Sequence, residues 1–341
     1  MHSLRNTFHP LARDVAGSLL LASGVTRPAR AARGRLTVVT FHRILPEEKL
    51  RDYPIEEIAV SVEEFGWFVD YFRRHYSCGT LASVYRRWVG GDRPERPFLA
   101  ITFDDGQLDG WEHARPVLDR AGIAASFFIP VDGVDRDELL WHDRLGYAAR
   151  RLLGADRPRA EALLGSAGDD RTLVTAAMER AKGLPPEERL AFVARVEGAL
   201  PGAARPAWDG LMSWEQLRAL SRSGHEVGSH SVTHPILPLV DDAQLAREVA
   251  GSKARLEAEL GVPCESFCYP NGDCDERVVE AVRRAGYLRA VTTAWGPNAP
   301  GADPFRLTRC DMDARRARNR AGALSEPRLA LRLSHFFPGA R

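Results

Sequence analysis

FLAITFDDG, residues 98–106, is the stretch that decides the fold, because an apolar run leads directly into two carboxylates and a glycine. The run predicts a buried strand. Since side chains alternate across a strand, Asp104 and Asp105 at its end diverge and can take different roles. Gly106 lets the chain turn sharply there. Asp-Asp-Gly is also ordinary turn chemistry, so its function depends on the rest of the chain.

Strand and helix patterns alternate along most of the sequence. Capping boxes at Ser61 and Ser213 predict the starts of two of the helices. Repeated strand-helix units predict a parallel sheet, and this many units in one chain favour a barrel over an open sheet. The expected fold class is therefore α/β, a distorted (β/α) barrel of about seven strands. Strands are expected at residues 36–41, 98–103, 125–129, 225–229, 265–269, 288–292 and 305–308.

The pattern divides the chain into three parts. Residues 1–35 are expected to form a helix and an arginine-rich linker, residues 36–320 the barrel, and residues 321–341 a tail. Residues 136–209 break the strand-helix rhythm, being rich in Arg, Ala and Leu with helical spacing, and are interpreted as a helical insertion. Whether the insertion shapes substrate access or only covers the sheet is left open.

Composition excludes several classes of function. Among 341 residues, 47 Lys and Arg balance 46 Asp and Glu, so no net field attracts nucleic acid or an anionic membrane. Five cysteines are too few for a disulfide framework in a chain of this length. Three of them lie within residues 264–274 without the paired spacing of structural zinc sites, which favours packed thiols over a metal site.

The N-terminal segment shows no membrane span or clear secretory signal. Its apolar run at residues 15–25 is too short to cross a bilayer, and no clean cleavage site follows it. Apolar residues recur with helical spacing from Leu4 to Leu19. A helix packed on the domain is favoured over a weak membrane-surface helix in residues 1–35. The expected location is cytoplasmic, with contact to the inner membrane surface as the alternative.

Chemically active side chains follow several of the predicted strands. His42, Asp104, Asp105, His230 and Tyr269 each lie at the carboxyl end of a strand. In a (β/α) barrel these ends gather on the face that carries catalysis. The sequence therefore predicts one shared site.

HSVTHP, residues 230–235, places two imidazoles four residues apart, so that both can face one point. Alone, such a pair is a weak signal. With a strand-end carboxylate it supplies two nitrogen ligands and one oxygen ligand. A three-ligand site with open positions is typical of catalytic metals rather than structural ones.

Three motifs carry a resemblance to a known family. TFDDG at residues 102–106 and HSVTH at residues 230–234 resemble the first two motifs of the polysaccharide deacetylases, carbohydrate esterase family 4 with its NodB homology domain. FCYPNG at residues 267–272 resembles a variant of the third motif, and GHEVGSH at residues 224–230 matches the family's approach to the histidines. The resemblance covers about residues 36–310 outside the insertion.

The resemblance implies different roles for the residues of the three motifs. Asp105, His230 and His234 would hold a divalent metal, zinc first, with Co²⁺, Ni²⁺, Mn²⁺ and Fe²⁺ as alternatives. Asp104 would be the general base, because a carboxylate bound to a metal is a poor base whereas its neighbour can take a proton from the attacking water. The backbone N–H of Tyr269, with the metal, would stabilise the oxyanion.

The sequence departs from the family pattern in two places. No Arg-x-Pro-Tyr motif is present, so no arginine of that motif is matched to tune the base. The usual acid, a histidine in a Leu-x-His motif, is matched only by His335 in the tail. In a branch with rearranged motif order an aromatic-His pair on an early strand takes its place, and Phe41-His42 resembles that pair. His42 is preferred because a strand holds it, although it could also be a buried histidine that only ends the first strand.

The resemblance implies a metal-dependent hydrolase that removes N-linked acetyl groups from a sugar in a polysaccharide or glycolipid. Substrate contacts are expected from Trp141, Pro270 and Asn271. An O-acetyl carbohydrate esterase would use the same residues. A carbohydrate-binding pseudoenzyme is the alternative outside the enzyme class.

Overall fold

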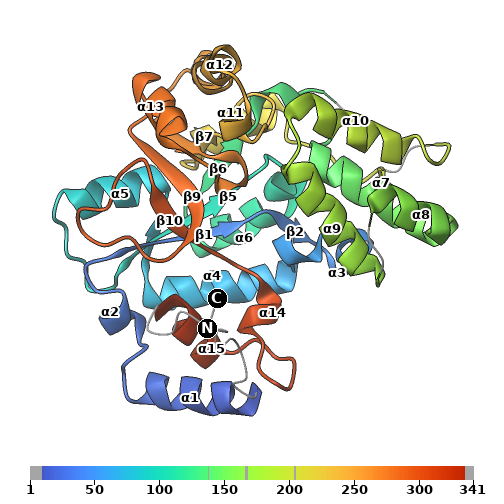
Figure 1. Cartoon of the computed structure of the whole chain (residues 1–341). Coiled ribbons are helices and arrows are strands. Elements are labelled where there is room, and N and C mark those ends of the chain that lie inside the picture. Colours follow the sequence, from blue (N-terminus) through green and yellow to red (C-terminus); the bar gives the residue numbers. More distant parts are fainter. Residues whose placement is uncertain (1–9, 137, 166–167, 203–204, 335–341) are drawn as a thin grey trace, which may run out of the picture.

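A closed barrel of seven parallel strands lies at the centre of the protein (Figure 1). The structure, a computed structural model, describes residues 10–136, 138–165, 168–202 and 205–334. The strand order is β1-β10-β9-β8-β7-β6-β5, and β5 pairs again with β1 to close the ring. The strands are β1 (Leu36–Phe41), β5 (Phe98–Phe103), β6 (Ser126–Ile129), β7 (Glu226–Ser229), β8 (Ser266–Cys268), β9 (Arg289–Trp295) and β10 (Leu307–Asp311).

Strand β5 organises the barrel. All six of its residues are buried, and it pairs with β1 along its whole length. On its other side it pairs first with β4 (Ser77–Gly79) and then with β6. The predicted (β/α) barrel and its seven strands are confirmed. Three short strands were not predicted, β4 and the separate pair β2 (Arg43–Leu45) and β3 (Ala59–Ser61).

Helices surround the barrel and begin where the capping residues predict. Ser61 and Ser213 both form complete capping boxes with the residue three positions later. Short 3₁₀ turns connect several strands and helices: η1 (Glu56–Ile58), η3 (Val131–Gly133), η4 (Leu237–Leu239) and η5 (Pro270–Gly272). The surrounding helices are α4 (Val62–His75), α5 (Leu81–Val89), α6 (Arg115–Ala121) after the π-helical turn η2 (Gly110–Ala114), α11 (Trp214–Arg222), α12 (Asp242–Leu260) and α13 (Glu276–Arg284).

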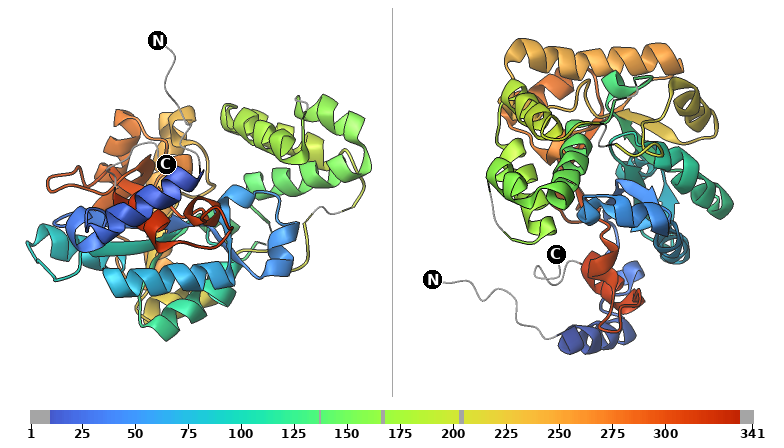
Figure 2. Two further views of the ribbon diagram at one scale, coloured as in Figure 1. Left: turned by 90° about the horizontal axis from the view of Figure 1, so that it is seen from below. Right: turned by 90° about the vertical axis from the view of Figure 1, so that its right-hand side faces the viewer.

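The predicted insertion contains four helices that stand beside the barrel (Figures 1 and 2). Their apolar faces form a hydrophobic cluster separate from the main core, with Leu145, Leu173 and Phe192 among its buried members. The insertion thus has a small core of its own. Its helices are α7 (Trp141–Ala155), α8 (Arg157–Leu164), α9 (Asp170–Lys182) and α10 (Pro186–Glu197), and α3 (Glu47–Asp52) precedes them in the chain.

A buried ionic cluster joins the insertion to the barrel. Arg43 on β2 contacts Asp109 at 2.8 Å, Asp209 at 2.6 Å and Asp143 at 3.7 Å. Burial raises the pKa of Asp109 to about 6 despite the opposing effect of Arg43. Asp143 lies in the first turn of α7 and Asp209 follows the last helix of the insertion. The guanidinium of Arg43 therefore contacts both ends of the insertion. Arg43 directly follows His42 in the sequence.

The terminal helices pack on each other. Figure 2 shows α1 (Pro10–Ala22) beside α15 (Glu326–Ser334), with α2 (Pro28–Ala31) close by and α14 (Ala314–Ala317) preceding α15 in the chain. The expected packed helix is present, but Val15 and Leu19 are 51% and 65% exposed. The packing face is instead the one with Gly17, which approaches Pro327 closely. Among the described residues, no helix is both long enough and apolar enough to cross a bilayer.

Candidate active site

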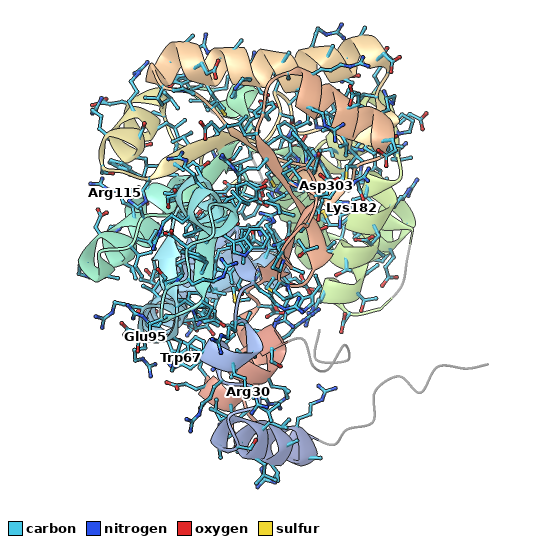
Figure 3. All side chains as sticks on the ribbon, turned by 90° about the vertical axis from the view of Figure 1, so that its left-hand side faces the viewer. Arg30, Trp67, Glu95, Arg115, Lys182 and Asp303 are labelled. Carbon is cyan, nitrogen blue, oxygen red and sulfur yellow. The ribbon has the colours of Figure 1, made fainter. Side chains whose placement is uncertain are left out.

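A cavity of about 220 Å³ lies at the carboxyl ends of the barrel strands. The barrel rim forms one wall, and α9 and η1 form the opposite wall. Figure 3 labels Lys182, which α9 contributes to this lining. The cavity therefore lies between the barrel and the insertion. It is lined by the predicted residues His42, Asp104, Asp105, Trp141, His230, His234, Tyr269 and Asn271, together with His142, Ile55, Ile58, Val174 and Met178.

Three ligand atoms in this cavity form a nearly equilateral triangle. The Nε2 atoms of His230 and His234 are 3.2 Å apart, and Oδ1 of Asp105 lies 3.4 Å and 3.3 Å from them. Zinc bonds of about 2.0–2.1 Å at tetrahedral angles place ligand atoms about 3.3 Å apart. The donor set and its spacing therefore fit a tetrahedral divalent ion with one open position.

Hydrogen bonds orient the two imidazoles. Nδ1–H of His230 donates to the carbonyl oxygen of Cys268 at 2.8 Å, which turns Nε2 toward the triangle. The backbone N–H of His234 donates to the Ser231 hydroxyl at 3.1 Å. Glu248 on α12 accepts from two backbone N–H groups of the intervening turn. Burial lowers the pKa of His234 to about 4, so this imidazole is neutral at pH 7, as a metal ligand must be.

The backbone at the motifs takes a left-handed conformation. Among the described residues, five other than glycine have positive φ, and Asp105, Ser231, His234 and Asn271 are four of them. Gly106, also at positive φ, makes the predicted turn directly after the carboxylate pair. These local turns aim the side chains of the motifs at the cavity.

Asp104 lies apart from the triangle and is held by Arg309. The guanidinium makes two hydrogen bonds of 2.8 Å and 2.7 Å to its carboxylate, and the side chains are only 1% and 3% exposed. Burial alone would raise the pKa of Asp104, but Arg309 lowers it to about 2, with His230 and His42 adding to the effect. Nε2 of His42 is 3.8 Å from Oδ2 of Asp104. Asp104 is therefore ionised at neutral pH and faces the histidine predicted as the acid.

Arg309 was not found from the sequence. The family's third motif offers no arginine here, and the structure supplies one from β10, a different strand. Residue 309 directly follows the strand predicted at 305–308, so its place near a strand's carboxyl end was the available signal.

Replacing Arg309 with methionine is expected to lower the free energy of unfolding at pH 7 by about 3–5 kcal/mol, because Asp104 would stay buried without its partner. The pKa of Asp104 lies below its ordinary 3.8, so the pair's contribution is complete above about pH 4. It is lost as pH falls through about 2. Urea unfolding of wild type and R309M at pH 7 and pH 4 measures the loss. A smaller difference is expected at pH 4, because burial without Arg309 raises the pKa of Asp104 in R309M and the carboxyl is then partly protonated.

The double variant R309M/D104N is the matched control. It leaves no buried charge at this position, so it should recover part of the stability that R309M loses. Equal unfolding midpoints for R309M and wild type at pH 7 would contradict the assigned role of the pair.

His142 is a second residue that the sequence did not single out. It lies in the first turn of α7, and its side chain is 12% exposed. Its Nε2 is 3.4 Å from Oδ2 of Asp105 and 3.6 Å from Oδ2 of Asp143. Burial alone would lower the pKa of His142, but the carboxylates of Asp143 and Asp105 raise it. Only the fold brings this helix to the cavity, so no local pattern could have indicated His142.

Some of the remaining predicted residues line the cavity and others do not. The expected oxyanion role of the Tyr269 N–H is wrong, because this group donates to the carbonyl oxygen of Val291 at 3.2 Å and belongs to the sheet. The Tyr269 hydroxyl donates to the Phe305 carbonyl oxygen. Trp141 and Asn271 line the cavity, whereas Pro270 is buried and is not part of the lining. His335 lies outside the described residues.

A second trio of metal-ligating types overlaps the first. Asp104, His230 and Cys268 also bring one ligand atom each within 4.8 Å of one another. Asp104 is occupied by Arg309, however, and burial raises the pKa of the Cys268 thiol, which disfavours the thiolate that a metal requires. The trio of Asp105, His230 and His234 is therefore the better candidate for a metal site. All five cysteines are free thiols.

The barrel resembles solved structures that include a deacetylase. The deacetylase PplD of Streptococcus pyogenes superimposes with a TM-score of 0.55 at 16% identity, covering 82% of this chain and 92% of that one. IcaB of Ammonifex degensii gives a TM-score of 0.54 at 20% identity, covering 82% and 91%. At these identities the likeness is evidence for a shared fold.

The sequence comparisons identify the family. Chitin deacetylase 1 of Cryptococcus neoformans is 27% identical over 81 residues, which is 24% of this chain and only 17% of that protein. The sequence profile of the polysaccharide deacetylases matches residues 91–290, more than half of this chain. The match contains all three motifs of the cavity, and the chain belongs to the polysaccharide deacetylase family.

Proposed function

We propose that this protein is a metal-dependent hydrolase that removes the acetyl group from an N-acetylated sugar of a polysaccharide or glycolipid. The single observation that carries the proposal is the triangle of Asp105, His230 and His234, with Asp104 held separately beside it. Two nitrogens and one oxygen suit zinc first, with Co²⁺, Ni²⁺, Mn²⁺ and Fe²⁺ as alternatives. Bound there, such an ion would act as a Lewis acid and make water acidic enough to react at neutral pH.

The protein's own residues would move the protons. Asp104 accepts a proton from the water that attacks the acetamide carbonyl carbon, and Arg309 keeps its carboxylate ionised and fixed. His42, 3.8 Å from Asp104, donates a proton to the leaving nitrogen. The bond between carbonyl carbon and nitrogen breaks, giving acetate and a free amino sugar. The two groups lie close together in one cavity, so the base can act when water attacks and the acid can act when the bond to nitrogen breaks.

The cavity lining supports recognition of a sugar. Trp141 is buried at the start of α7, and its indole N–H makes no hydrogen bond among the described residues. Val174 and Met178 on α9 face the same space. An apolar wall with a few polar groups is typical of a site that binds a sugar ring and an acetyl methyl group. Asn271, whose amide donates to Asp273, forms part of the opposite wall.

The direct test is acetate release by the zinc-loaded protein from polymeric, lipid-linked and free N-acetylated sugars, in parallel with O-acetylated sugars. Release from the N-acetylated set supports the proposal, and release from the O-acetylated set alone makes the protein an esterase. Zinc binding with no release from either set would support the carbohydrate-binding alternative instead.

Replacing His42 with alanine is expected to lower turnover by about 10²-fold or more, in the range of a lost general acid, with zinc still bound. Steady-state kinetics and metal content measure the two effects. His113→Ala is the matched control, because His113 lies outside the cavity lining. Turnover of H42A within a few-fold of H113A would move the acid role to another group, with His335 tested next.

A further inference from the structure

We propose that His142, carried by the insertion, is a positioning residue for Asp105, so that the insertion completes the metal site. The inference rests on the proposed function only in taking Asp105 as a metal ligand. The two carboxylate oxygens of Asp105 face different partners. Oδ1 points to the imidazole pair at 3.3 Å and 3.4 Å, and Oδ2 lies 3.4 Å from Nε2 of His142.

This division fixes the rotation of the carboxylate. A carboxylate can turn about its Cβ–Cγ bond and can bind an ion through one oxygen or both. With Oδ2 facing Nε2 of His142 at 3.4 Å, Oδ1 is the oxygen presented to the triangle, which keeps a position open for water and substrate. Partners of metal-ligating carboxylates have this effect in other metal sites.

A second carboxylate, that of Asp143, lies 3.6 Å from Nε2 of His142. Asp143, the next residue on α7, is buried and accepts 2.7 Å and 2.6 Å hydrogen bonds from the Tyr53 hydroxyl and the Gln107 amide. Gln107 follows Asp105 by two residues, so the network returns to the same motif. Nε2 of His142 lies between the Asp105 and Asp143 carboxylates, and it makes no hydrogen bond of good geometry within the described part of the chain.

The ring is also fixed by its neighbours. His142 packs edge-on against His234, with ring centroids 5.4 Å apart, and against Trp141 at 5.5 Å. Its nitrogen lies near one predicted ligand, Asp105, and its ring packs against another, His234. It does not join the triangle of ligand atoms, which is Asp105, His230 and His234. Its role is therefore to orient a ligand rather than to bind the metal.

The test compares H142L, which fills space but cannot donate, with H142Q, whose amide N–H can still reach Asp105. Zinc affinity is measured by competition with a chromogenic chelator. H142L should bind zinc about 10- to 100-fold more weakly than wild type, the usual cost of losing such a partner, and H142Q should restore most of the affinity. At saturating zinc, H142L should keep the wild-type KM.

Two controls separate orientation from general loosening. The melting temperature of the metal-free protein should be similar for H142L and wild type, whereas a merely structural role would lower it. Leu173→Ala, in the buried core of the insertion and away from Asp105, should weaken the insertion but leave zinc affinity unchanged. An equal loss of zinc affinity in L173A would overturn the proposal.

Other outcomes are equally decisive. Wild-type zinc affinity in H142L would overturn the inference, and a raised KM without weaker zinc binding would make His142 a substrate contact instead. If the wild-type protein binds zinc but releases no acetate, the proposed function fails while the zinc measurements still decide the role of His142. If it binds no zinc, both proposals fall.

Discussion

Replacing Asp104 with asparagine is expected to reduce acetate release by about 10²- to 10⁴-fold while zinc remains bound at full stoichiometry. Asparagine has nearly the same shape but cannot accept a proton from water. Asp104 is not a member of the ligand triangle, so its loss should leave the metal in place. Steady-state kinetics and elemental analysis of the same preparation measure both halves of the prediction.

Asp313→Asn is the matched control for Asp104→Asn. Asp313 is also a buried carboxylate with an arginine partner, Arg315 at 2.8 Å, but it lies outside the cavity lining. Asparagine can still cap the helix that Asp313 begins, so turnover should stay near wild type. D104N that keeps more than a tenth of wild-type turnover would show that Asp104 is not the base, and D104N that loses its zinc would show that Asp104 helps to hold the metal.

Removing any one ligand of the triangle should remove the metal. Asp105→Ala, His230→Ala and His234→Ala each leave only two protein ligands, too few for a stable catalytic zinc site. We expect less than stoichiometric zinc after gel filtration and no detectable acetate release. Elemental analysis gives the zinc content directly.

The control for the ligand variants is His75→Ala, because His75 lies at the end of α4, outside the cavity lining. It should retain full zinc. A ligand variant that also keeps full stoichiometric zinc would refute the assignment of that residue, and the trio that includes Cys268 would then be the next candidate.

The barrel could be predicted because its signals are local. Strands β1, β5 and β6 are short runs of mainly apolar residues, and all of their residues are buried. The two capping boxes are also local, since their hydrogen bonds join residues three positions apart. The three-residue strands β2, β3 and β4 carry no such signal.

The candidate site was predictable only in part, because half of it depends on contacts between distant segments. The carboxylates and the two histidines stand out as motifs, and the fold brings them together as the strand-end argument requires. Arg309 and Asp104 are 205 positions apart, and no pattern near either one predicts their pair. The N–H of Tyr269 was misassigned because its sheet partner, Val291, is known only once the strands are paired.

The left-handed backbone at Asp105, Ser231, His234 and Asn271 lowers folding stability in return for the geometry of the candidate active site. Each such residue costs on the order of 1–3 kcal/mol, a notable share of the roughly 5–15 kcal/mol by which a domain stays folded. The closed barrel must supply that difference. Engineering for heat tolerance therefore belongs in the barrel interior, since relaxing these four positions would gain stability by giving up the geometry of the rim.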